Sequence, residues 1–360
     1  MSRRHTPYLL GVLLLVWGAA QGAVVAAQTP SPAANADEPV RVVASGLLNP
    51  RGLAIAPDGL LLVALGGTGG DSAALVAIDD GCPTTVVDGI RSYPIVFGAP
   101  VGVADVAVRD GTTYFLVAGG DIDSGAMPNG LYRVAPGGEP ELVADISTFI
   151  RDNPVAERPP DYDTDGQPYH LTPVDGGFLV SEGNSNQLLR VGLDGSVSRV
   201  ADLSAGHPIP TGVTLGPDGA IYVATFTPAP YPEGGAVVLR IAPDGTAAPV
   251  WTELTMIAAL TTGPDGRLYA LESATGHGAE ADDLDPASGR VVELHPDGTW
   301  TPLVTGLPVP ADMAFAPDGR LIIDGPAFAA ADAPGLVLSI ALPTSGALDT
   351  SDLGPVPRCA

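Results

Sequence analysis

Short apolar runs alternate along the chain with turns rich in Asp, Gly and Pro. The unit VVASGLLNPRGLAIAPDG at 42–59 aligns without a gap with PLVTGLPVPADMAFAPDG at 302–319, and PTGVTLGPDGAIYVA at 210–224 repeats it. Self-similarity at a spacing of roughly 50 residues indicates a repeat architecture. The copies are centred on turns at Asp58, Asp110, Asp175, Asp218, Asp265 and Asp318.

Each copy has a second half in which an apolar run, a turn and another apolar run follow, as in LLRVGLDGSVSRVADL at 188–203. Every unit therefore holds four short strands joined by Asp-Gly or Gly-Gly turns, which favour tight hairpins. No segment between them has the period of an amphipathic helix. Such units are typical of propeller blades. We predict an all-β fold, a six-bladed β-propeller of four-stranded blades.

The sixth unit supplies only three strands before the pattern becomes irregular. The segment VRVVASGL at 40–47 resembles the end of the fifth unit, and we expect it to be the missing outer strand. An N-terminal strand would then close the last blade. The propeller is predicted to span residues 40–342, and an irregular C-terminal tail is predicted over 343–360.

The N-terminus has the features of an export signal. Arg3 and Arg4 precede a long apolar run, and Val25-Ala26-Ala27 suits signal peptidase. We predict a signal peptide over 1–27, a disordered Pro/Ala-rich linker over 28–39, and a secreted or extracytoplasmic protein. Because the apolar run is long, a membrane anchor that remains uncleaved is the alternative.

Two cysteines, Cys82 and Cys359, are present in a chain expected to be exported. An even number in an oxidising compartment favours a disulfide. Cys82 lies in the outer turn of blade 1, and Cys359 ends the tail that leaves the neighbouring blade 6. We therefore predict a Cys82–Cys359 bond across the seam of the ring.

The net charge of the chain excludes some classes of binding partner. The net charge is −25, and all 16 basic residues are Arg. Such a chain cannot neutralise phosphates, so we expect neither nucleic acid nor an anionic membrane surface as a partner, beyond the N-terminal anchor alternative. We expect a monomer that binds a small molecule, a glycan or a protein.

Hairpin topology sorts the loops onto two faces. The turns within each inner and each outer hairpin are short and share one face, whereas the longer connections share the other. Long loops in a compact repeat fold are usually either functional or disordered, and we predict that the long-loop face binds the ligand. Its candidate residues are Asp121, Tyr169, His170, Asn184, His207, Phe226, Tyr231 and His277.

The segment DYDTDG at 161–166 has the spacing of the first half of a calcium-binding loop. Asp161, Asp163 and Asp165 could direct carboxylates toward one ion, since calcium prefers six to eight hard oxygen ligands. The twelfth position, where an EF-hand has Glu, is Thr172. A structural calcium ion ordering the channel mouth is one reading, and a solvated Asx turn is the other.

A second candidate group consists of acids at the ends of second strands, namely Glu182, Glu272 and Asp324, with His170 nearby. Such acids could encircle the channel and hold a metal, and His170 could act as a general base. Alternatively, each acid accepts hydrogen bonds from backbone N–H groups of its own loop, the usual behaviour of such side chains.

Several segments resemble a known family. NPRGLAIAPDGLLLVA, QPYHLTPVDGGFLVSEGNSNQLLRV and IPTGVTLGPDGAIYVATFTPAPYPEGG are similar to the ScyD/ScyE-type exported propellers, relatives of NHL-repeat and SMP-30/gluconolactonase-like propellers. The resemblance covers roughly 40–342 and implies the six-bladed fold and export. The chain departs from the family at DDGCPTT in blade 1 and at His170, where Gly is common. The metal ligands of the gluconolactonase branch cannot be carried over to this chain, because only Glu182, Glu272 and Asp324 resemble them in type and placement.

Two functions follow from these patterns. The preferred one is a secreted binding or scaffold propeller that uses its long-loop face, with calcium as a structural ion. The alternative is a metal-dependent lactonase or esterase, with zinc, calcium or manganese held by the strand-end acids.

Overall fold

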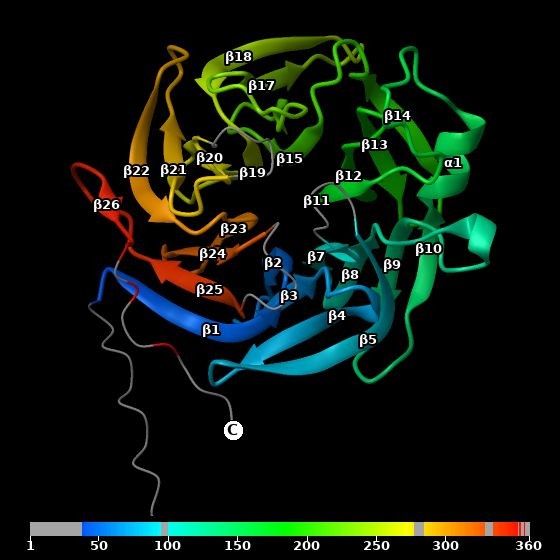
Figure 1. Cartoon of the computed structure of the whole chain (residues 1–360), viewed down its shortest axis with the longest axis horizontal. Coiled ribbons are helices and arrows are strands. Elements are labelled where there is room, and N and C mark those ends of the chain that lie inside the picture. Colours follow the sequence, from blue (N-terminus) through cyan, green and yellow to red (C-terminus); the bar gives the residue numbers. More distant parts are fainter. Residues whose placement is uncertain are drawn as a thin grey trace, which may run out of the picture. The chain divides into compact units, whose positions relative to one another are not determined.

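The computed structural model describes residues 38–94, 100–276, 284–327, 334–351, 353 and 356. Within these residues the strands form six sheets, arranged as blades around a common centre (Figure 1). Each innermost strand contacts the innermost strands of both neighbouring blades, and blade 1 meets blade 6 to close the ring. The predicted six-bladed β-propeller is confirmed.

The blades follow one another along the chain, and the strands of each run in order from the innermost to the outermost. Blade 1 comprises β2 (Pro50–Ile55), β3 (Leu61–Leu65), β4 (Gly70–Asp79) and β5 (Cys82–Pro94), extended by β6 (Pro100–Val101). Blade 2 comprises β7 (Val103–Arg109), β8 (Thr112–Val117), β9 (Gly130–Val134) and β10 (Glu141–Asp145). Blade 3 comprises β11 (Pro168–Val174), β12 (Gly177–Glu182), β13 (Gln187–Gly192) and β14 (Val197–Asp202).

The second half of the ring repeats this order. Blade 4 comprises β15 (Pro210–Leu215), β16 (Ile221–Thr225), β17 (Ala236–Ile241) and β18 (Ala247–Leu254). Blade 5 comprises β19 (Ile257–Thr262), β20 (Leu268–Glu272), β21 (Gly289–Leu294) and β22 (Trp300–Leu307), extended by β26 (Leu348–Asp349). Blade 6 comprises β23 (Asp312–Phe315), β24 (Leu321–Gly325), β25 (Pro334–Ile340) and β1 (Val40–Leu48).

The ring is closed by the N-terminal strand, as predicted. β1, blue in Figure 1, pairs antiparallel with the red β25, from Val40 opposite Ile340 to Leu48 opposite Pro334. The tail beyond residue 342 was expected to be irregular, but its described part includes a short strand. This strand, β26, pairs in parallel with β22 through Val304 and Leu348.

The short turns explain the repeated Asp-Gly pairs. In blade 4, Gly216 N donates to Ala220 O at 2.9 Å, and Asp218 Oδ1 accepts from Ala220 N at 3.1 Å. Gly219 has a φ of 73°, a left-handed conformation that glycine adopts without strain. The side-chain bond recurs at three other inner turns, through Asp58, Asp265 and Asp318. These recurrent acids therefore stabilise turns.

The core is divided among the seams between blades. Apolar clusters join each blade to the next, for example Phe178 of blade 3 to Tyr114 of blade 2, whose ring centroids lie 5.1 Å apart. The seam between blades 2 and 3 is also covered by α1 (Ile146–Asp152), a short helix that the sequence pattern did not predict. It begins at Asp145, whose side chain accepts from Thr148 N at 2.8 Å, an N-cap interaction.

Several predictions concern residues outside those described. The signal peptide, nearly all of the linker, His277 and Cys359 belong to this group, so the Cys82–Cys359 bond and the export signal stay predictions. Within the described residues, no helix has the length and apolar character needed to cross a membrane.

Candidate functional site

A pocket of about 250 Å³ occupies the central channel and is lined by all six innermost strands. Its lining runs from His170, Asp105 and Asp312 toward the ends of the strands, where the short turns begin. The remaining wall is largely apolar and includes Leu53, Val213 and Leu260 among others. The charged residues therefore form the inner end of a mostly aliphatic channel that extends toward the short-turn face. The predicted use of the long-loop face stays a prediction.

Two of these acids join neighbouring innermost strands. Asp105 of blade 2 accepts from Leu171 N of blade 3 at 2.7 Å, and Asp312 of blade 6 accepts from Leu53 N of blade 1 at 3.0 Å. Gly52 makes room for the first of them, because a Cβ there would lie 2.4 Å from Asp105 Oδ1. These carboxylates therefore satisfy backbone groups across two seams.

His170 lies between the two carboxylates. Its Nε2 is 3.8 Å from Asp105 Oδ2 and 3.6 Å from Asp312 Oδ1. Burial alone would lower the pKa of His170, but the charges of Asp105 and Asp312 outweigh it and raise this pKa to about 9. Burial raises the pKa of Asp105 to about 7, although the charge of His170 opposes this.

Two further charged residues, Arg51 and Asp324, lie next to the triad formed by Asp105, His170 and Asp312. The Arg51 guanidinium is buried and stacks over the ring of Tyr169, with 5.7 Å between Cζ and the centroid. Asp324 Oδ1 accepts from Asp312 N at 2.8 Å. Burial and the charge of Asp312 raise the pKa of Asp324 well above its usual range, which Arg51 counteracts only in part.

Polar atoms in the centre remain without partners among the described residues. His170 Nδ1, Asp312 Oδ1 and Asp324 Oδ2 are buried and have no hydrogen-bond partner there. A buried polar group without a hydrogen bond is costly, so native structures rarely retain one without a reason. The centre of the ring is thus suited to receive a hydrogen-bonding group.

The structure places Glu182 and Glu272 elsewhere. Glu182 is fully buried and accepts from the backbone N–H groups of Gln167, Asn184 and Ser185, and from the Ser185 hydroxyl. Glu272 accepts from Thr255 N at 2.6 Å and pairs with the Arg290 guanidinium. Of the three strand-end acids, only Asp324 reaches the central cluster.

The acids of the Asp-rich loop have separate partners. Asp161 Oδ1 lies 3.2 Å from His207 Nε2, and Asp165 Oδ1 pairs with Arg151 at 2.8 Å. Asp163 Oδ1 accepts from Asp165 N at 2.9 Å, the geometry of an Asx turn. In the part of the chain that the structure describes, no three His, Cys, Asp or Glu side chains are grouped so that they could hold a metal ion. Calcium binding by this loop stays a prediction.

The other long-loop candidates form local contacts. Asp121 pairs with Arg91 at 3.1 Å and caps Ser124, and Asn184 bonds to the backbone at both Asp161 and Asp163. Phe226 and Tyr231 pack edge to face with centroids 5.5 Å apart. These residues order the loops on their face, and the structure does not bring them together with the central cluster.

Sequence reasoning missed Arg51, Asp105 and Asp312. A signal was nevertheless present, because Asp105 and His170 each stand five positions before the Asp of their turn. Equivalent positions on adjacent innermost strands meet at the same height of the channel. Counting residues from the Gly of each inner turn also distinguishes Asp324 from the other two strand-end acids. Asp324 follows the turn Gly by five residues, whereas Glu182 and Glu272 follow theirs by six, and alternate strand residues face opposite sides.

No known protein family and no curated protein matches this chain by sequence. Solved structures do match by fold. An oxidoreductase (glucose dehydrogenase) of Thermus thermophilus has a TM-score of 0.57 and 17% identity, covering 83% of this chain and 98% of its own. The gluconolactonase XC5397 of Xanthomonas campestris has 0.55 and 13%, over 84% and 89%. The soluble aldose sugar dehydrogenase of Escherichia coli has 0.51 and 14%, over 83% and 98%. The structural neighbours are therefore gluconolactonase-like and related propellers, and at these identities the likeness shows the fold alone.

The central residues do not fit a divalent metal site. Three acids meet there, but Arg51 and His170 already supply positive charge between them. Three acidic oxygens of the cluster also accept from backbone N–H groups of neighbouring strands, and these oxygens are therefore not available as metal ligands.

Proposed function

We propose that the chain is an exported ligand-binding propeller whose central pocket holds a small organic ammonium ion against Asp312, beside the pair formed by His170 and Asp105. The observation that carries this proposal is the meeting of three carboxylates with only two basic side chains at the inner end of the largely aliphatic pocket. Burial and the neighbouring carboxylates raise the pKa values of Asp105 and Asp324, and ionisation of all five groups leaves one negative charge uncompensated. An ammonium group balances this charge and donates to Asp312 Oδ1, which faces His170 at 3.6 Å but accepts no hydrogen bond within the described residues.

The rest of the pocket suits the organic part of such a ligand. Its wall beyond the triad consists largely of aliphatic side chains, such as Ile55, Val108 and Ala314, which accept an alkyl chain. The volume of about 250 Å³ restricts the ligand to a small molecule. A net charge of −25 also attracts cations to the protein.

The same geometry favours binding over metal-dependent hydrolysis. A hydrolase of that type would use Glu182 and Glu272 as ligands, yet both are occupied by backbone N–H groups or by Arg290. Their bonds hold the loops to which they belong. Assays with lactone and ester substrates, with and without a chelator, test this alternative, and chelator-sensitive turnover lost in Glu182→Gln and Glu272→Gln would favour it.

Calorimetric titration with ethylammonium, ethanolammonium and tetramethylammonium tests the binding proposal. The first two carry N–H donors and should bind, whereas tetramethylammonium should not. Asp312→Asn should weaken binding at least about tenfold, a loss of roughly 1.4 kcal/mol. His207→Gln, a change on a different loop, should leave affinity unchanged. Failure of all three ions to bind at millimolar concentration, or equal affinity for all three, would reject the proposal.

The binding step should also release protons. The raised pKa of Asp105 means that this carboxyl is partly protonated near neutral pH. An ammonium ion nearby stabilises the carboxylate, so the measured heat should depend on the ionisation enthalpy of the buffer. Equal heats in phosphate and Tris buffers would contradict a site at Asp105.

A structural calcium ion at Asp161, Asp163 and Asp165 remains a separate part of the proposal. It requires these carboxylates to exchange their present partners for the ion. Calcium should then raise the melting temperature of chelator-treated protein, and Asp163→Ala with Asp165→Ala should abolish the rise. Identical melting of both proteins with and without calcium would reject the ion. Export and membership of the ScyD/ScyE-type family, likewise proposed, rest on the sequence features of the N-terminus and blades 3 and 4.

A further inference from the structure

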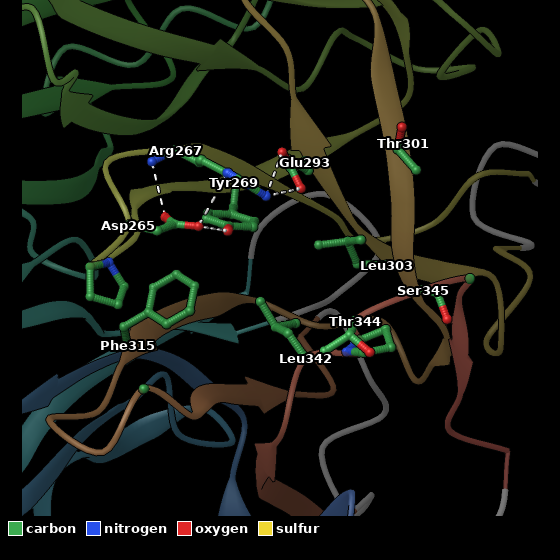
Figure 2. A pocket seen from close by; sticks show the side chains of 14 residues that line it. Asp265, Arg267, Tyr269, Glu293, Thr301, Leu303, Phe315, Leu342, Thr344 and Ser345 are labelled. Atoms are coloured by element: carbon green, nitrogen blue, oxygen red, sulfur yellow. Dashed lines mark hydrogen bonds and ion pairs between the residues drawn. The ribbon is translucent and has the colours of Figure 1, made fainter.

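A second and larger pocket lies outside the channel, at the seam between blades 5 and 6 (Figure 2). Its volume is about 520 Å³, within the range of roughly 300–1,000 Å³ that small-molecule sites occupy. One wall is formed by blade 5, another by the inner turn of blade 6 with Phe315, and a third by the segment Leu342 to Gly346.

The blade 5 wall presents a row of polar side chains. Tyr269, Glu293 and Thr301 stand directly opposite one another on three successive strands, so they share one face of the sheet. Arg267, in the turn before β20, lies 3.1 Å from Glu293 Oε1 and 3.4 Å from Asp265 Oδ2. Figure 2 shows these contacts as dashed lines. The guanidinium side chain is 59% exposed, and so it remains accessible to a ligand.

Two aromatic side chains, Tyr269 and Phe315, also line the pocket. The Tyr269 ring packs against Phe315 with centroids 5.1 Å apart and an interplanar angle of 60°. The Tyr269 hydroxyl donates to Asp265 Oδ2 at 2.9 Å, which fixes its ring. Phe315 is only partly buried, so the ring offers apolar surface to the pocket.

The third wall is a strap held at both ends. It leaves β25 of blade 6 and enters β26, which pairs with the outer strand of blade 5. Thr350 N donates to Thr305 O at 2.9 Å, which secures the far end. The strap brings Thr344 and Ser345 to the pocket, and their hydroxyls can both donate and accept.

Comparison with the equivalent positions of blade 4 shows which residues distinguish the wall of this pocket. In blade 4, Arg240 stands opposite Tyr222 and pairs with Asp218 at 3.1 Å. Trp251 packs against Tyr222 there, with centroids 5.4 Å apart. Blade 5 has Glu293 in the position of Arg240, and its arginine stands in the turn instead. The Asp, Tyr and Arg residue types are thus shared, but blade 5 adds an acid, Glu293.

We infer that this seam binds a neutral sugar, with one face of the ring on Phe315 and its hydroxyls on Arg267, Asp265 and Glu293. A pyranose has an apolar face and a rim of hydroxyls that both donate and accept. The pocket supplies the matching groups, since the arginine only donates and the ionised carboxylates only accept. Arg267 already pairs with both carboxylates, and a ligand that adds no charge leaves these ion pairs intact. A small anion would be repelled by Asp265 and Glu293, whereas the hydroxyls of a neutral polyol can donate to the carboxylates and accept from the guanidinium.

Saturation-transfer NMR and calorimetry with methyl glucoside, methyl galactoside and cellobiose test this inference. We expect binding of at least one sugar, with the strongest saturation on the ring protons of the face against Phe315. Arg267→Ala and Glu293→Gln should each weaken binding at least about tenfold. Phe315→Leu keeps an apolar side chain but removes the ring, and it should abolish the selective saturation.

Matched controls separate this site from the rest of the molecule. Arg240→Ala removes the corresponding arginine of blade 4, which is 47% exposed, and should leave sugar affinity unchanged. Asp312→Asn, in the central channel, should also have no effect. Absence of binding at millimolar sugar, or affinity unaffected by Arg267→Ala, would overturn the inference. Tighter binding of glucosamine or glucuronate than of the neutral sugars would overturn its neutral specificity.

Discussion

His170 of blade 3 and Asp312 of blade 6 stand on opposite sides of the six-bladed ring, yet His170 Nε2 lies 3.6 Å from Asp312 Oδ1. The channel is therefore narrow enough at this height for side chains to meet across it. Asp105, on the blade next to His170, completes the group at 3.8 Å. One imidazole between two carboxylates couples the charge of the centre to pH.

This coupling predicts a stability that falls as pH rises. The folded-state pKa of His170, about 9, lies above the ordinary value of 6.5. The contribution of His170 to the free energy of unfolding is therefore complete below pH 6.5 and is lost as the pH rises through 9. For an imidazole this shift corresponds to about 3 kcal/mol. Asp105 acts in the same direction at lower pH, because its folded-state pKa of about 7 is also raised, from 3.8.

Chemical denaturation of the wild type and of His170→Gln between pH 6 and 10 measures this effect. The difference in unfolding free energy should shrink as pH rises through the upper part of that range. His207→Gln is the matched control, since that imidazole pairs with a single half-exposed carboxylate, Asp161. A difference that stays constant with pH would contradict the pairing of His170 with Asp105 and Asp312.

Asp312 is predicted to stabilise the seam between blades 6 and 1. Asp312→Ala leaves Leu53 N without its acceptor and removes one counter-charge of His170, so we expect a loss of about 3 kcal/mol or more. Asp312→Asn keeps an oxygen that can accept from Leu53 N and should cost less. Urea unfolding distinguishes the two, and equal stability of both variants would show that this hydrogen bond contributes little.

The fold was predictable because its signals are local. Four of the inner Asp-Gly turns carry their own cap, as Asp218 does for Ala220, and the repeat of these turns defines the blades. The closing strand was predictable for the same reason, since 40–47 resembles other outer strands. The helix α1 was not predictable, because its stability comes from the Asp145 cap and from packing of Ile146 and Ile150 at a seam.

The candidate site depends on distant positions. Asp105, His170 and Asp312 belong to three blades, and only the closed ring brings them together. The sequence indicated His170 as a candidate, but nothing distinguished Asp105 from the other residues of its strand. Glu182 shows the opposite case, because a strand-end acid that looked like a ligand bonds to its own loop.

Glu182→Gln and Glu272→Gln should lower stability while leaving metal content unchanged. The amide that replaces a carboxylate oxygen presents N–H groups to donors such as Ser185 N and Arg290 Nε, so about 2 kcal/mol or more should be lost in each. Thermal melting with elemental analysis of the purified proteins measures both quantities. A stoichiometric metal in the wild type that disappears in both variants would restore the hydrolase hypothesis.

Cys82 begins β5 in blade 1, where a bond to Cys359 would attach the C-terminal tail. We expect non-reducing peptide mapping of the native protein to yield a Cys82–Cys359 peptide pair. Cys82→Ser should then cost about 2–4 kcal/mol, the usual contribution of a disulfide. Alkylation of both thiols in the untreated native protein would refute the bond.

Leu47 and Leu48 give a direct test of ring closure by β1. Leu47 is 1% exposed and packs in the seam between blades 6 and 1, whereas its neighbour Leu48 is 43% exposed. Leu47→Ala should therefore lower the unfolding free energy by about 2–5 kcal/mol, the range for a buried leucine. Leu48→Ala, the same change one residue later, should stay within about 0.5 kcal/mol of the wild type. Urea denaturation gives both values, and equal losses would mean that β1 does not pack against blade 6 in this register.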